Sequence, residues 1–82
     1  MADGIEARIA KDIGKFSGSI DDIKGIELDK RMAEIVELSK MYASDAKSYL
    51  DKGDYPTSFS CISYAHGLLD AVKMLLGVKT YV

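Results

Sequence analysis

Apolar side chains recur every three or four residues along most of the chain, which is the spacing of one face of an α-helix. Over residues 3–24 the series consists of Ile5, Ile9, Ile13, Phe16, Ile20 and Ile23. Gly14 and Gly18 interrupt it, and a glycine inside a helix costs about 1 kcal/mol relative to alanine. We therefore predict a helix over residues 3–24 that could break near Gly18, with Ser19 then capping a short second piece.

A second apolar stripe predicts a longer helix over residues 27–52, after Gly25 has ended the first. The stripe consists of Leu28, Met32, Ile35, Tyr42, Ala46 and Tyr49, and it is widened by Val36, Leu38, Ala43 and Leu50. At 1.5 Å per residue this helix is roughly 38 Å long. The width of the stripe indicates a broad buried face.

The third predicted helix covers residues 54–76. Asp54 is suited to cap it and Pro56 to its first turn, while Gly53 and Gly77 end the second and third helices. Its apolar lines are Phe59, Ile62, Leu69 and Leu76, and beside them Cys61, Ala65, Leu68, Val72 and Leu75. A turn as short as Lys-Gly-Asp makes the second and third helices antiparallel. The sequence thus predicts an all-α, three-helix, up-down-up bundle formed by a single domain, residues 1–82.

The size of the chain adds an expectation about assembly. With 82 residues, of which 48% are hydrophobic, the chain is near the lower limit for a single stable core. Cys61 is the only cysteine, so an internal disulfide is excluded. The sequence therefore favours oligomerisation as the source of additional stability. We expect a homodimer that buries Met, Tyr and Leu side chains of the second and third helices.

Charge and segment length argue against several other partners. The net charge is −2, and the 11 basic residues are scattered rather than clustered, which is untypical of nucleic-acid binding. The start of the chain lacks the pattern of a signal peptide, and the apolar runs are far too short to span a membrane. We expect a cytoplasmic protein that neither enters a membrane nor binds nucleic acid.

His66, the only histidine, lies between Ser63 and Asp70 on one side of the third helix. A catalytic triad normally converges from different elements and needs oxyanion donors beside its nucleophile, which a mid-helix serine lacks. We therefore assign no catalytic residue, and expect a half-buried His66 held by Asp70 or by a tyrosine of the second helix. Two ligands are too few for a stable metal site, although a metal shared across a dimer stays open. No cofactor is implied.

The alternative to an assembly module is a small-ligand or nucleotide binder. Its pocket would be lined by Tyr42, Tyr49, His66 and Asp70, beside Gly67. A glycine in the middle of a helix suggests either close approach by another helix or room for a ring beside it.

Two segments carry a resemblance to a known family: Tyr-Leu-Asp-Lys-Gly-Asp-Tyr at residues 49–55, and Tyr-Ala-His-Gly-Leu-Leu-Asp-Ala at residues 64–71. Here the chain resembles the short archaeal proteins of domain-of-unknown-function family 357, specifically over residues 38–76 and more loosely over the first helix. The resemblance implies a compact helical protein, archaeal and intracellular, of unassigned activity. It supplies no catalytic residues.

A fainter similarity is to the helical modules called HEPN domains, which share a helix, a Gly-Asp turn and an Ala-rich return helix. Their RNase pattern places an arginine four to six residues before a histidine. No arginine follows Arg31 in this chain, so the similarity does not imply RNase activity. The sequence favours a non-enzymatic module that associates with itself or docks a protein partner, with the small-ligand binder as the alternative.

Overall fold

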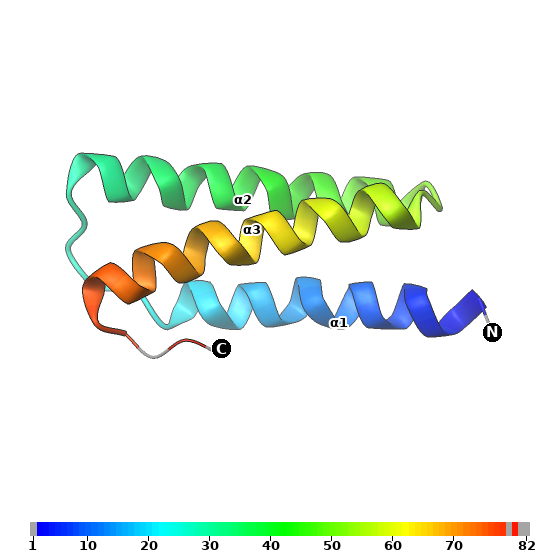
Figure 1. The fold of residues 1–82 in the computed structure, drawn as a ribbon, viewed down its shortest axis with the longest axis horizontal. Coiled ribbons are helices and arrows are strands. Elements are labelled where there is room, and N and C mark those ends of the chain that lie inside the picture. Colours follow the sequence, from blue (N-terminus) through cyan, green and yellow to red (C-terminus); the bar gives the residue numbers. More distant parts are fainter. Residues whose placement is uncertain (1, 79, 81–82) are drawn as a thin grey trace.

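The chain forms three α-helices in a computed structural model that describes residues 2–78 and 80. They are α1 (Ala2–Asp21), α2 (Lys30–Asp51) and α3 (Tyr55–Leu76), and they run up, down and up along a molecule of 42 × 20 × 17 Å (Figure 1). No strand occurs among the described residues. The predicted all-α bundle is confirmed; of the predicted domain 1–82, residues 1, 79, 81 and 82 lie outside the described residues. Within the described part, no helix combines the length and apolar character needed to cross a membrane.

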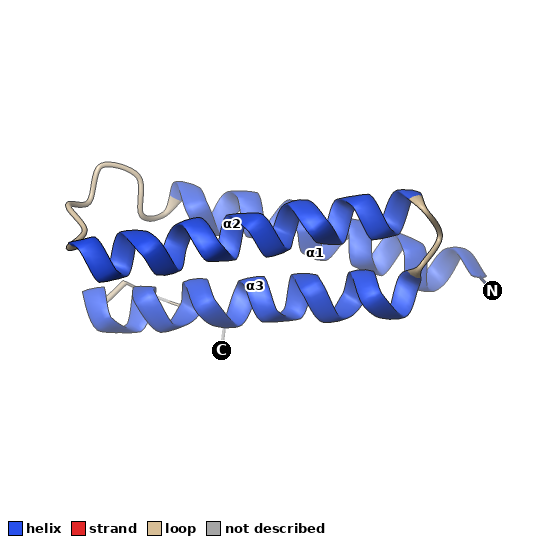
Figure 2. Cartoon of the chain, turned by 90° about the horizontal axis from the view of Figure 1, so that it is seen from above, coloured by secondary structure: helices blue, strands red, loops and turns tan. Residues whose placement is uncertain are grey.

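The antiparallel pair α2 and α3 is the most closely packed part of the fold (Figure 2). The turn between them ends at Asp54, whose carboxylate accepts a hydrogen bond from Thr57 N–H and caps α3. Gly53 adopts φ +79°, a conformation that favours glycine, so the chain reverses within three residues. The predicted start of α2 at residue 27 is wrong. Asp29 caps the helix by accepting from Met32 N–H, so α2 begins at Lys30.

Helix α1 is continuous, so the break near Gly18 that the sequence allowed does not occur. Gly14 and Gly18 are exposed and lie within the helix. Their cost in helix propensity is offset by the packing of Ile9 and Phe16, which are buried against the hairpin. The helix ends at Asp21, three residues earlier than predicted, and a turn through Gly25 (φ +80°) leads toward α2.

A single apolar core runs between the helices. Its buried members come from all three helices and from the turn after α1: Ile9, Phe16, Ile23, Val36, Ala46, Ile62, Ala65, Leu69 and Val72. Two buried serines, Ser39 and Ser58, donate their hydroxyl groups to backbone carbonyls. Ser58 Oγ donates to Ala46 O at 2.6 Å and so links α3 to α2.

Lys73 is completely buried between α3 and the end of α1. Its Nζ donates to Ser19 Oγ at 2.9 Å and lies 3.1 Å from Asp22 Oδ2. A buried ammonium is stable only when it is paired and hydrogen-bonded. Ser19 is therefore an acceptor inside α1 rather than the cap of a second piece. The three side chains together fix the end of α1 to α3.

Candidate functional site

A polar groove of about 610 Å³ lies between α1 and α3. Its lining residues from α3 are Phe59, Ser63, His66, Gly67 and Asp70, and those from α1 are Arg8, Asp12 and Lys15. Two sequence-predicted site residues, His66 and Asp70, thus share one groove. The site also gathers two cations and two carboxylates, which suits a polar small molecule better than an apolar one.

His66, one of the residues that line this groove, bridges the two helices. Its Nε2 lies 2.8 Å from the Asp12 carbonyl oxygen, which can only accept, so Nε2 carries the proton. The ring packs edge-on against Phe16, with centroids 5.6 Å apart and an interplanar angle of 83°. His66 is half-buried, as expected, but the expected partner was wrong. It is held by the backbone of α1 and not by Asp70 or a tyrosine of α2.

Ser63 and Asp70 flank His66 without engaging it. Among the described residues, neither side chain forms a hydrogen bond with the imidazole, whose Nε2 is occupied by Asp12. The nucleophile–base contact of a hydrolytic triad is therefore not made in this arrangement. Within the same described residues, no group of three or more His, Cys, Asp or Glu side chains is arranged to hold a metal ion.

Tyr42 and Tyr49, the other two predicted site residues, are not among the residues that line this groove. Tyr42 packs edge-on against Tyr64, with centroids 4.6 Å apart, at the seam of α2 and α3. The ammonium group of Lys52 lies over the ring of Tyr49, with Nζ 5.4 Å from the ring centroid. The structure therefore brings together two of the four predicted residues, His66 and Asp70, and places neither tyrosine in their groove.

Gly67 faces open space. A Cβ added to it would have no atom within 4 Å apart from its own local backbone, so no neighbouring helix approaches it closely. The interpretation of Gly67 as a close-packing glycine is wrong. The absence of a side chain at Gly67 instead leaves space in the groove, which agrees with the second interpretation, room for a ring beside it.

Sequence reasoning missed the α1 side of the groove. Arg8, Asp12 and Lys15 are spaced by four and three residues, so they form a polar line on one side of α1. That periodicity indicates a polar side of α1, but it does not show which of the other helices this side would face. The α1–α3 packing determines this.

A second surface lies on the hairpin itself, on the side that α1 does not cover. Val36 and Lys40 are among the α2 residues that face α1. Leu38 is two residues from each of them, which is a rotation of about 200° around the helix. Leu38 therefore lies on the side of α2 that faces away from α1. Tyr42 is one turn from Leu38 and touches Tyr64, which places the exposed apolar residues of α2 and α3 on the same side. We call this surface the outer face; it comprises Leu38, Met41, Tyr42, Tyr64, the partly exposed Leu68 one turn from Tyr64, and Leu75.

Cys61 lies one turn from Tyr64, beside the outer face. Burial raises the pKa of its thiol, and the negative charges of Asp45 and Asp54 raise that pKa further. A raised pKa leaves less thiolate at neutral pH, so Cys61 is a weak nucleophile. It is not a candidate catalytic group.

Comparison with known families gives one result. The family model described as a protein of unknown function (DUF357) matches residues 11–78, from the middle of α1 to just beyond α3. The match confirms the resemblance carried by residues 49–55 and 64–71, and it also includes the second half of α1. No curated protein matches the chain.

Proposed function

The chain belongs to the DUF357 family, whose function is unknown, and we propose that it is a helical assembly module that forms a homodimer through its outer face. The observation that carries this proposal is the exposure of large apolar side chains there. Leu38, Tyr64 and Leu75 are 38%, 51% and 70% exposed, respectively. Contiguous apolar side chains on one side of a small domain are typical of an interaction surface.

The outer face is also self-complementary in charge. Arg31, Leu38 and Asp45 follow one another at seven-residue spacing, so they form one line along α2. When two copies of α2 pair antiparallel about a two-fold axis at Leu38, each Arg31 lies opposite the other copy's Asp45. A two-fold interface requires such self-complementarity. This argument favours a second copy over an unrelated partner.

The test is molar mass by light scattering over a range of protein concentrations, with charge reversals in the proposed line. We expect a dimer, weakened at least tenfold by Arg31→Asp or by Asp45→Arg alone, because each places like charges opposite one another. The double variant restores the opposite pairing and the affinity. Lys11→Asp, an exposed reversal on α1, is the matched control and leaves dimerisation unchanged.

Three outcomes separate the parts of this proposal. A wild-type chain that stays monomeric at all concentrations rejects self-association. A dimer that is insensitive to Leu38→Lys rejects the outer face as its interface. A dimer that is lost in Leu38→Lys but unaffected by either charge reversal retains the face and rejects the antiparallel register.

A second candidate function, binding of a small anionic ligand such as a nucleotide, is supported by the α1–α3 groove. Arg8 and Lys15 provide positive charge for a phosphate, and the exposed ring of Phe59 provides a surface for stacking. A thermal-shift screen of nucleotides tests it. Stabilisation that is lost in Arg8→Ala but kept in Lys11→Ala supports this function, and a screen without any stabilising nucleotide rejects it.

A further inference from the structure

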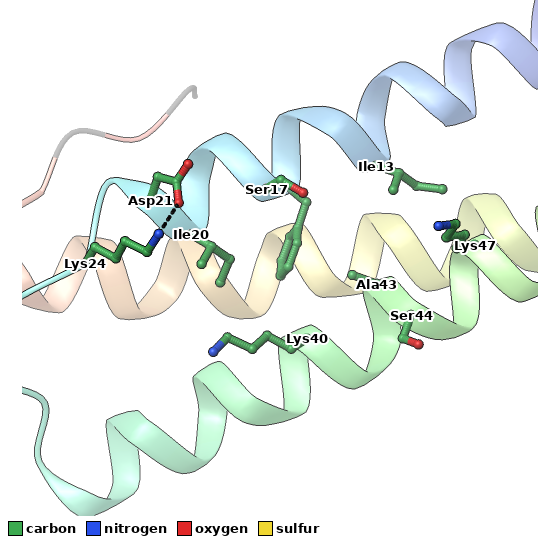
Figure 3. A pocket seen from close by; sticks show the side chains of 10 residues that line it. Ile13, Ser17, Ile20, Asp21, Lys24, Lys40, Ala43, Ser44 and Lys47 are labelled. Atoms are coloured by element: carbon green, nitrogen blue, oxygen red, sulfur yellow. Dashed lines mark ion pairs between the residues drawn. The ribbon is translucent and has the colours of Figure 1, made fainter.

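A second groove, of about 520 Å³, lies between α1 and α2 (Figure 3). Its apolar surface is formed by Ile13, Phe16 and Ile20 of α1 and by Ala43 of α2. On its α2 side the groove is lined by two small residues, Ala43 and Ser44, while the hydrogen bonds of His66 and Lys73 hold α1 to α3. It lies on the opposite side of α2 from Leu38, so a dimer through the outer face leaves it accessible.

Cations surround this apolar surface. Lys24, Lys40 and Lys47 line the groove together with a single carboxylate, Asp21. The net charge of the lining is thus +2, in a chain whose net charge is −2. Figure 3 shows Lys24 and Lys40 toward one end of the groove and Lys47 toward the other, beside Ile13.

The ion pairs that these lysines already form leave them able to bind another anion. Lys24 pairs with Asp21 at 3.3 Å and Lys40 with Glu37 at 3.3 Å, and all four side chains are substantially exposed. Exposed pairs of this kind contribute little and exchange readily for another anion. Among the described residues, no carboxylate lies within ion-pairing distance of Lys47.

We propose that this groove binds a single-chain anionic amphiphile, a fatty carboxylate. Its hydrocarbon chain lies on Phe16, Ile20 and Ala43, and its carboxylate lies between Lys24 and Lys40. The stem of Lys47 covers the far end of the chain while its ammonium stays in water. The volume falls within the roughly 300–1,000 Å³ of small-molecule sites. A helix with its side chains is about 10–12 Å across, so a single methylene chain fits this groove better than a docked peptide helix.

The experiment is calorimetric titration of the full chain with dodecanoate below its micelle concentration, at low ionic strength. We expect one site per chain, with affinity about tenfold lower in Lys40→Glu because an attractive charge becomes repulsive. Ser44→Leu places an apolar side chain in the groove and also lowers the affinity. Lys11→Glu, the same reversal at an exposed α1 position outside the groove, leaves it unchanged.

Dodecyltrimethylammonium has the same hydrocarbon chain with the opposite charge, and we expect it not to bind. Equal binding of the two amphiphiles, or unchanged dodecanoate affinity in both Lys40→Glu and Ser44→Leu, overturns the proposal in favour of non-specific adsorption. Binding to phosphatidylglycerol vesicles without binding to monomeric dodecanoate overturns it in favour of a membrane surface. Absence of binding to either rejects it outright.

Discussion

At the scale of single residues, His66 shows how far sequence reasoning reaches. Its place among apolar positions predicted a half-buried ring, and the structure agrees. Its hydrogen-bond partner is a backbone carbonyl, that of Asp12, 54 residues away. Every residue has a carbonyl group, so no side-chain pattern could have indicated which one would meet the imidazole. The half-burial was predictable and the partner was not.

Gly67 gives the first residue-scale prediction. Because it lies inside α3 with open space where a Cβ would be, Gly67→Ala removes the helix penalty of glycine without a clash. We expect the free energy of unfolding to rise by about 0.5–1 kcal/mol. Urea denaturation measures this. Gly53→Ala is the contrasting substitution: at φ +79° alanine is strained, so stability should fall. A destabilised Gly67→Ala would mean that the backbone there needs glycine.

At the scale of elements, the helix ends were better predicted than the packing of α1. The glycines at 53 and 77 have the positive φ values that end helices, which is why α3 was placed within one residue. Lys73 is different. A lysine in the last turn of a helix is commonly an exposed group that favours the helix dipole, and nothing in its neighbourhood distinguishes it. Its burial follows from the meeting of α1 and α3, which a single helix pattern does not contain.

The contact of Lys73 with Ser19 predicts a local effect on α1. Ser19→Ala removes an acceptor from a buried ammonium, and we expect it to lower the free energy of unfolding by about 1–3 kcal/mol. Amide hydrogen exchange should rise first at the end of α1, where the contact fixes the helix. Ser17→Ala, an exposed change two residues away in the same helix, should have an effect below about 0.5 kcal/mol. Equal effects of the two variants would show that the contact is not stabilising.

At the scale of the whole molecule, α1 covers one side of the hairpin and leaves the outer face uncovered. If two chains associate there, unfolding must also separate them. The melting temperature should then rise with protein concentration. Leu75→Asp should abolish that rise, and differential scanning calorimetry at several concentrations measures it.

The neighbouring residue provides the control for this measurement. Met74 is 69% exposed, nearly the same as the 70% of Leu75, but one residue along a helix is a rotation of about 100°, away from the outer face. Met74→Asp should therefore keep the concentration dependence. Loss of the dependence in both variants would indicate a general effect of added charge rather than an interface.

The position of the partners of α1 also affects how the chain folds as it is synthesised. The hydrogen bonds between α1 and α3 include those that join Asp12 to His66 and Ser19 to Lys73, each across 54 residues, and Glu6 to Tyr55, across 49 residues. α1 leaves the ribosome before any of these partners on α3 has been made. The α2–α3 hairpin, by contrast, needs only its own short turn to close, and local contacts form fastest. The first helix synthesised is therefore the last to dock, and until Lys73 emerges the apolar side of α1 must stay in solution without its native cover.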